Sequence, residues 1–257
     1  MSLKICALAS GSKGNCCYVS DGHTDILVDL GISAGRVEKC LNVLGVNADN
    51  LNVLVTHCHS DHVNGLRVFC KHHENVKIHC QKECFYGVAS ASGVPVIAEP
   101  ERRFIVGTLS VFAIPVSHDV PCFGYIISDG SKKAAVVTDV GALNTAQLTA
   151  LSSCNIVMLE CNHDVNKLYA NPKYTSALKA RINSKHGHLS NSDCAAACAF
   201  LASNGVKDFI LAHLSEENND PGLAVDTVNN ALYGAGLCGV RVVTASQNAM
   251  TGLFEIC

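Results

Sequence analysis

Three histidines and one aspartate lie within six consecutive residues, in the segment HCHSDH at positions 57–62. His57 and His59 are two residues apart, so an extended backbone points both imidazoles to the same side and Cys58 to the other. Asp61 and His62 follow where the chain is expected to turn into a helix. Because burying this many polar groups without a ligand is costly, the segment predicts a metal site. Its two pairs of ligands can serve two neighbouring ions.

Three further candidate ligands each follow an apolar, strand-like segment. VFAIPVS precedes His118, AAVVT precedes Asp139 and FILA precedes His213, just as LNVLVT precedes His57. Loops at strand ends are where a rigid sheet presents reactive side chains. We therefore expect His118 and His213 to complete one ion site each, and Asp139 to bridge two ions about 3.5–4 Å apart. Mixed imidazole and carboxylate ligands favour zinc, manganese or iron over calcium.

Short β-rich segments and helical patterns position these residues in both halves of the chain. The predicted strands are 4–10, 16–20, 25–31, 51–57, 76–80, 110–118, 123–130, 134–141, 155–163 and 207–213. The predicted helices are 33–45, 61–73, 191–204 and 221–236. No linker or low-complexity run divides the halves, so we expect a single domain over residues 1–257, with two packed sheets and helices outside them.

The composition is that of a globular protein with a substantial core, because 48% of the 257 residues are hydrophobic and 16% are charged. The longest apolar stretches are strand-sized, well below the roughly 18 residues that a membrane span needs. The N-terminus lacks the apolar core of a secretory signal, so we expect a cytoplasmic protein without membrane contact. The 15 cysteines are odd in number and form no CxxC pair, which indicates reduced thiols.

The net charge of −3 excludes bulk electrostatic attraction of nucleic acid, so any polyanion must be held locally. Small basic clusters occur at Arg102 and Arg103, at Lys132 and Lys133, and at Lys185. Each is typical of a solvated turn.

Taken together, HCHSDH, SHDVPCFGY at 117–125, TDVG at 138–141 and LAHLS at 211–215 resemble the metallo-β-lactamase superfamily. The resemblance covers essentially the whole chain. It implies an α/β (α+β) fold, a four-layer αββα sandwich with a dinuclear metal site at one edge of the two sheets.

Peripheral motifs indicate the branch. LASGSKGNCCYV, LECNHD, GHLSNSDCA and LAHLSEENNDPGLA are similar to the YycJ/WalJ group, single-domain relatives of the nuclease branch. This resemblance implies an exonuclease that acts on nucleic acid, with DNA favoured. The interval between Asp139 and His213 is already occupied by predicted strands and helices, which excludes a β-CASP insertion. We also expect no extended arm like the tRNA-binding arm of ribonuclease Z.

Two residues are predicted to be catalytic. Asp61 would orient the attacking water, a hydroxide shared by the two metals, and accept its proton. His188 stands just before a helix start, where Ser190 and Asp193 have the spacing of a capping box. Because helix N-termini attract anions, His188 is expected to meet the phosphate and protonate the leaving oxygen without binding either ion.

The predicted substrate contacts are His188, Ser190, Asn162 and His163. Asn162 and His163 lie with Glu160 in LECNHD. These side chains either enter the cleft, where they contact the substrate or support the groups that do, or they belong to a structured loop. GSKGN at 11–15 is read as a tight turn in preference to a phosphate loop.

Two other functions fit the same metal ligands. One is hydrolysis of a small thioester or lactone, which needs no phosphate-binding histidine. The other is a non-catalytic metal-binding partner in signalling. The oligomeric state is left open by the sequence.

Overall fold

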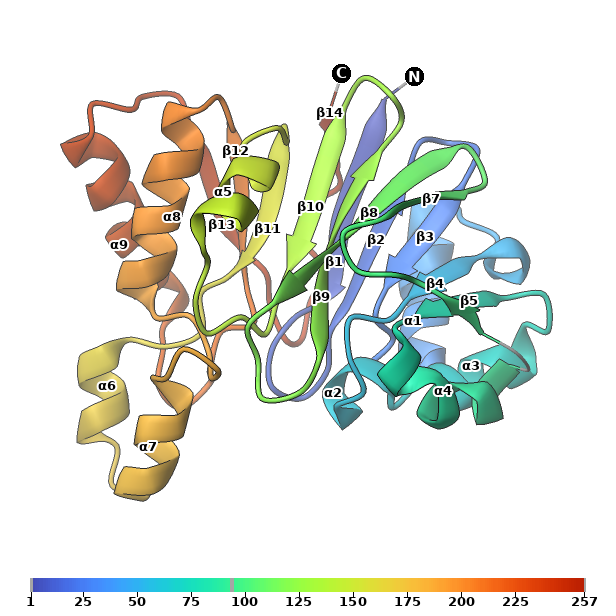
Figure 1. Ribbon diagram of the computed structural model, residues 1–257, viewed down its shortest axis with the longest axis horizontal. Coiled ribbons are helices and arrows are strands. Elements are labelled where there is room, and N and C mark those ends of the chain that lie inside the picture. The colour runs from blue at the N-terminus through green and yellow to red at the C-terminus, as the bar shows by residue number, and fades with distance from the viewer. Residues whose placement is uncertain (1, 93–94, 257) are drawn as a thin grey trace.

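The computed structural model describes residues 2–92 and 95–256, in which two seven-stranded sheets face each other and helices cover both outer faces (Figure 1). This is the predicted αββα sandwich. The first sheet has the order β14-β1-β2-β3-β4-β5-β6, and the second has the order β13-β12-β11-β10-β9-β8-β7. In each sheet one half is antiparallel and the other is parallel. The two halves of the chain therefore share one plan.

The elements have the following bounds. The first sheet contains β1 Leu3–Ala9, β2 Cys16–Ser20, β3 Asp25–Val28, β4 Asn52–Leu54, β5 Lys77–Cys80, β6 Val96–Ile97 and β14 Phe254–Ile256. The second contains β7 Arg103–Val106, β8 Leu109–Val116, β9 Cys122–Ser128, β10 Lys133–Val137, β11 Ile156–Glu160, β12 Asp208–Ala212 and β13 Arg241–Thr244. The α-helices are α1 Ala34–Leu44, α2 Ser60–Val63, α3 Leu66–His72, α4 Phe85–Ser92, α5 Thr145–Leu151, α6 Val165–Ala170, α7 Ser176–Ile182, α8 Asn191–Ser203 and α9 Pro221–Gly234.

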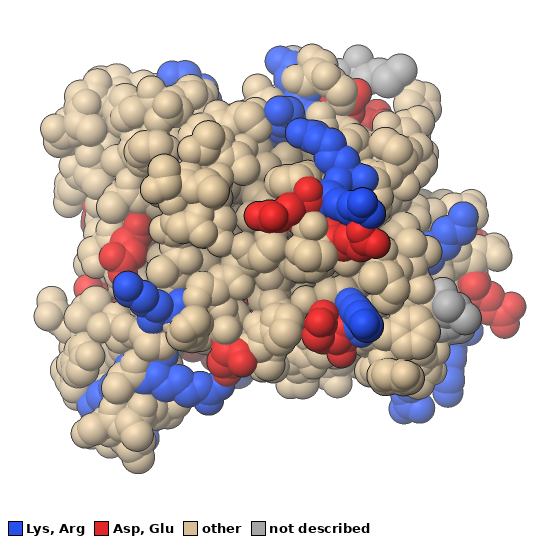
Figure 2. Space-filling model, in the orientation of Figure 1, with Lys and Arg blue, Asp and Glu red and all other residues tan. Residues whose placement is uncertain are grey.

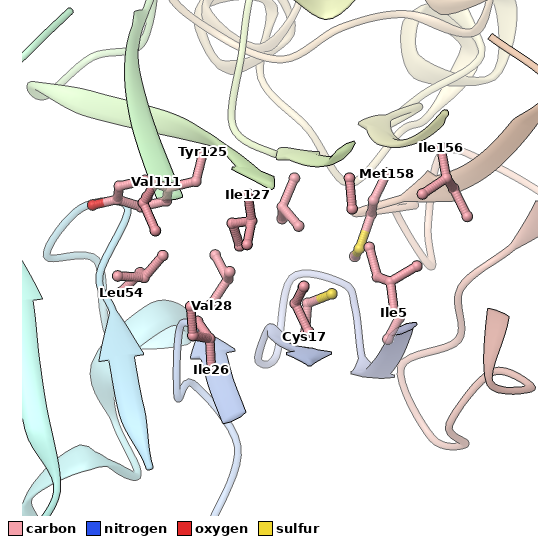
Figure 3. Close-up of a cluster of buried hydrophobic side chains, with 14 of the residues drawn as sticks. Ile5, Cys17, Ile26, Val28, Leu54, Val111, Tyr125, Ile127, Ile156 and Met158 are labelled. Atoms are coloured by element: carbon pink, nitrogen blue, oxygen red, sulfur yellow. The ribbon is translucent and has the colours of Figure 1, made fainter. Parts of the chain in front are cut away.

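Apolar side chains from both sheets meet in the central core (Figure 3). Ile5 and Val28 come from the first sheet, and Tyr125 and Met158 come from the second. Tyr125 is fully buried, and its hydroxyl donates to the carbonyl of Val55, 2.8 Å away, which ties the second sheet to the first. This core keeps the ends of the two sheets in fixed relative positions.

Helices form the outer layers. α1, α3 and α4 cover the first sheet, and α5, α8 and α9 cover the second (Figure 1). Cys194 and Cys198 of α8 are buried against the second sheet, as the helical spacing predicted, and the cysteines of the described residues are free thiols. No helix in the described ranges is long and apolar enough to cross a membrane.

Two expectations about helices were wrong. The predicted helix 61–73 is broken into α2 and α3. The backbone amide of Gly65 donates to the carbonyl of Leu30 at 2.9 Å, and the carbonyl of His62 accepts from the amide of Leu30 at 2.8 Å, so these groups pair with the segment after β3 and not within one helix. The second error concerns residues 165–182, where α6 and α7 project from the sandwich at the lower left of Figure 1. We call this projection the α6–α7 arm. The sequence analysis predicted no helix over these residues, and its expectation of no arm like that of ribonuclease Z stays a prediction.

Candidate metal centre

Strands of both sheets end at the lower edge of the sandwich in Figure 1, and the predicted ligands lie just past these ends. His57 follows β4, Asp139 follows β10 and His213 follows β12. Asp139 and His213 have φ values of 55° and 54°, in the left-handed region that non-glycine residues seldom adopt. Strain of this kind concentrates at functional sites, because the surrounding structure must hold it.

The seven predicted ligands come together as the spacing suggested. The ligand atoms of His57, His59 and His118 lie within 4.8 Å of one another, and so do those of Asp61, His62 and His213. Asp139 lies between the groups: its Oδ2 is 3.0 Å from Nε2 of His62, and its Oδ1 is 4.0 Å from Nε2 of His118. The geometry is that of two adjacent three-residue sites with one shared carboxylate, and the role of these residues as metal ligands stays a prediction.

Unpaired polar atoms test whether these residues fit metal ions. Nε2 of His57, His118 and His213 and Oδ2 of Asp139 are buried and have no hydrogen-bond partner. The 3.0 Å approach of Asp139 to His62 lacks the angle of a hydrogen bond. A buried polar atom without a partner costs about 1–3 kcal/mol, so four in one cluster call for a ligand. Imidazole nitrogens and a carboxylate fit zinc, manganese or iron.

Two buried carboxylates behind the cluster orient the histidines. Asp29 accepts from Nδ1 of His62 at 2.7 Å and from the backbone amide of Thr56 at 2.8 Å. Glu160 Oε1 accepts from Nδ1 of His213 at 2.7 Å. A carboxylate on Nδ1 fixes the tautomer and turns Nε2 toward the cluster. Nε2 of His213 has no hydrogen-bond partner there, whereas Nε2 of His62 lies 3.1 Å from the side-chain amide of Asn15. The sequence analysis missed Asp29, although it follows β3 as His57 follows β4.

The pKa values of the histidines differ because some of them have a carboxylate neighbour that outweighs burial. Burial lowers the pKa of His57 to about 2, so this imidazole is neutral. Burial also acts to lower the pKa of His213, but Asp139, Asp61 and Glu160 outweigh it and raise the pKa to about 10. Asp139 and Asp29 likewise raise the pKa of His62 well above its usual range, although burial acts to lower it. The carboxylates thus create a negative potential that two cations would compensate.

The support from Asp29 leads to a prediction about metal affinity. Asp29→Asn is expected to weaken metal binding about 10–100-fold, because His62 loses the carboxylate that holds its ring. Competition with a chromophoric chelator measures the change. Asp49→Asn is the matched control, because Asp49 also pairs with a histidine, His73 at 2.9 Å, but on the exposed surface. Equal affinity in the two variants would remove Asp29 from the metal site.

Gly31 fixes the position of the ligand loop. A Cβ on Gly31 would lie 1.7 Å from the carbonyl oxygen of Asp61, and the same carbonyl accepts from the amide of Asn15 at 2.8 Å. We expect Gly31→Ala to destabilise the fold by about 3 kcal/mol, at the upper end of overpacking costs, and to lower the metal content. Urea unfolding and elemental analysis test this. Gly35→Ala is the control, because nothing lies within 4 Å of its added Cβ in α1.

His59 and His118 are linked to the α6–α7 arm through Asp119. Oδ1 of Asp119 lies 3.5 Å from Nε2 of His59 and 3.1 Å from Nε2 of His118. Its other oxygen forms an ion pair with Arg181 of α7. The sequence analysis did not single out Asp119, and its only signal was its place next to His118.

His188 lies beside the metal cluster and is partly accessible, with 23% of its side chain exposed. Its Nδ1 bonds Glu160 at 2.8 Å and lies 3.8 Å from Asp139. Burial acts to lower the pKa of His188, but the Glu160 carboxylate outweighs burial and raises it. Because Glu160 occupies Nδ1, Nε2 is the nitrogen left for a substrate. Glu160 therefore holds both His188 and His213.

The other three predicted substrate contacts lie in buried positions. Ser190 is 1% exposed, Asn162 5% and His163 0%. The Ser190 hydroxyl caps α8 by accepting from the amide of Asp193, Asn162 donates to the carbonyl of His213, and His163 pairs with Asn183. These contacts favour the structured-loop alternative for Asn162 and His163 and a capping role for Ser190, and His188 is the most exposed of the four. Their roles toward a substrate stay a prediction.

A four-layer αββα sandwich with histidine and aspartate ligands at the shared edge of its sheets defines a class of metal-dependent hydrolases. Residues 24–214 match the family model described as a β-lactamase superfamily domain. The chain is similar over its length to the curated proteins "Exodeoxyribonuclease YycJ" of Bacillus anthracis and "Exodeoxyribonuclease WalJ" of Streptococcus pneumoniae. It belongs to the metallo-β-lactamase superfamily and, within it, to the YycJ/WalJ group.

The curated relatives are similar to this chain over nearly their whole length. The Bacillus protein is 32% identical, with 92% of this chain and 91% of the relative covered. The Streptococcus protein is 30% identical, with 100% and 99% covered. Among solved structures, YhfI from Bacillus subtilis has a TM-score of 0.75 at 15% identity, covering 99% of this chain and 100% of that one. The short form of human tRNase Z has a TM-score of 0.63 at 13% identity, covering 97% of this chain and 98% of that one. These structures show the fold alone.

Proposed function

We propose that this protein is a phosphodiesterase that removes nucleotides from DNA with the help of two divalent metal ions, zinc, manganese or iron. The observation that carries the proposal is the convergence of unpaired imidazole and carboxylate atoms beside an accessible histidine. The names of the full-length relatives, both exodeoxyribonucleases, favour DNA as the substrate and an exonuclease as the type of enzyme.

In this proposal His57, His59 and His118 hold one ion, Asp61, His62 and His213 hold the other, and Asp139 lies between them. When bound, such ions neutralise phosphate charge and make water acidic enough to lose a proton near neutral pH. Burial acts to raise the pKa of Asp61, but the imidazoles of His213 and His62, 3.6 and 3.4 Å from its Oδ2, hold it well below its usual range. Asp61 is therefore ionised, as both a ligand and a proton acceptor must be.

The hydrolysis step uses one residue on each side of the phosphorus. The water oxygen forms a bond to phosphorus, and the proton of the water passes to Asp61. The bond from phosphorus to the leaving sugar oxygen breaks, and that oxygen takes a proton from Nε2 of His188. The Glu160 carboxylate raises the pKa of His188, which favours the protonated ring that can donate from Nε2.

End-labelled single- and double-stranded DNA and RNA test the proposal directly. We expect metal-loaded protein to release nucleotides from DNA and Asp61→Ala to release none. Asp49→Ala, an exposed aspartate outside the cluster, should behave as wild type. Rapid turnover of simple thioesters with every nucleic acid left intact would support the small-molecule hydrolase instead. Bound metal without any hydrolysis would support the signalling partner.

A further inference from the structure

The α6–α7 arm carries a local positive charge in a chain whose net charge is −3. The arm and the turn after it, residues 165–187, contain five lysines and arginines and no aspartate or glutamate: Lys167, Lys173, Lys179, Arg181 and Lys185. From here on we count this turn as part of the arm. Figure 2 shows lysine and arginine side chains over this lower-left projection, with acidic side chains only toward its inner edge. The arm is thus the kind of local basic surface that an acidic protein needs to hold a polyanion.

These charges are only partly neutralised by the protein. Lys173 pairs with Glu217, and Arg181 pairs with Asp119. Lys179 donates to the carbonyl of Tyr169 at 2.7 Å. Within residues 2–92 and 95–256, no carboxylate lies within ion-pair distance of Lys179 or Lys185. The charges of Lys179 and Lys185 are therefore not compensated by a carboxylate, on and just after an element that has no buried residue.

A cavity of about 220 Å³ separates the arm from the metal cluster. His118, Asp119 and His188 line it together with Tyr174, Leu178 and Arg181, and the Asp119 carboxylate is paired with Arg181. The volume is below the 300–1,000 Å³ usual for a drug-sized ligand, so it fits a smaller group such as one nucleobase. An aromatic ring beside cations is the surface that single strands use, since every base has a face that stacks.

The arm and the turn that carries His188 are in direct backbone contact. The amide of His188 donates to the carbonyl of Ile182, the last residue of α7, at 2.8 Å. A Cβ on Gly187 would lie 2.2 Å from the carbonyl oxygen of Arg181, so the turn that leads to His188 is packed directly on α7. A DNA strand bound to the arm is therefore held in a fixed position relative to His188, the proposed proton donor.

We propose that the cavity binds the nucleotide next to the scissile phosphate, its base against Tyr174, and that the phosphates beyond it lie along the arm's basic side chains. This inference rests on the proposed function and adds the position of the bound DNA strand on the protein. It assigns Lys179, Arg181 and Lys185 to the phosphates and Tyr174 to the base.

Charge removal on the arm tests the phosphate contacts. Binding of a 20-nucleotide single-stranded DNA is measured against salt for Lys179→Gln/Lys185→Gln and for the control Lys39→Gln/Lys71→Gln, an equal charge loss on exposed positions of α1 and α3. We expect the arm variant to bind about 10-fold more weakly and its salt slope to fall by about 1.4, roughly 0.7 for each lost contact. The ratio of turnover on DNA to turnover on a nitrophenyl phosphodiester should fall in parallel.

Substitution of the ring tests the base contact without changing charge. Tyr174→Leu should weaken DNA binding about 10-fold, within the range for loss of one stacked base, whereas Tyr174→Phe should stay near wild type. The contradicting result is wild-type cleavage of DNA together with equal DNA affinity in the arm variant and its charge control, and in Tyr174→Leu and Tyr174→Phe. The DNA strand then lies elsewhere, and only this inference is overturned. If wild type cleaves no nucleic acid, the proposed function fails with it.

Discussion

His188→Ala is expected to lose about a hundredfold or more in turnover on DNA while it keeps its fold and its metals, the usual range for removing a general acid. The geometry gives the reason: Glu160 holds Nδ1 at 2.8 Å, so the ring presents Nε2 to the leaving oxygen, and the raised pKa of His188 favours the protonated ring that can donate there. A natural DNA leaving group is a poor one and needs that proton. The loss should therefore appear in kcat.

Comparison of two substrates separates acid catalysis from phosphate binding. A nitrophenyl phosphodiester has a good leaving group, so His188→Ala should affect its hydrolysis much less than that of DNA. His72→Ala serves as the control, because His72 also pairs with a glutamate, Glu38 at 2.7 Å, on the exposed surface. Equal losses on both substrates would indicate phosphate binding, and unchanged turnover would remove His188 from the mechanism.

Asp139→Asn is expected to lower DNA hydrolysis about a thousandfold, because metal ions supply several kcal/mol of transition-state stabilisation and each 1.36 kcal/mol is tenfold in rate. The neutral amide no longer balances two cations, so the metal content should fall from two ions per chain to one or fewer. Asparagine tolerates the left-handed backbone, with φ 55° at this position, better than alanine does. The fold should therefore survive, and the loss reports on the metals.

Circular dichroism and elemental analysis complete this test. Asp226→Asn is the matched control, an exposed aspartate on α9. Two ions retained by Asp139→Asn with full activity would exclude a shared carboxylate at this position.

The ligand cluster was predictable because it follows a simple physical rule. Parallel strands that end at one edge bring their following residues together, so His57, Asp139 and His213 could be related from apolar runs alone. The same rule applied to β3 would have found Asp29. The family resemblance supplied the order of the layers.

Other features depend on contacts that no local pattern carries. At the break between α2 and α3, the backbones of His62 and Gly65 pair with Leu30, which is more than thirty residues away in the chain. α7 has no buried residue and so lacks the apolar period that predicts a helix. Asn162 was assigned to substrate because it follows a strand, but its amide donates to the carbonyl of His213. A polar side chain at a strand end serves a neighbouring loop as readily as it serves a site.

Titration of metal-free protein with manganese or zinc, with release of nucleotides from end-labelled single-stranded DNA followed at each step, tests the two-metal phosphodiesterase most directly. The geometry predicts that activity rises until two equivalents are bound per chain and then stays constant. A plateau at one equivalent, or no nucleotide released at any metal loading, would contradict it.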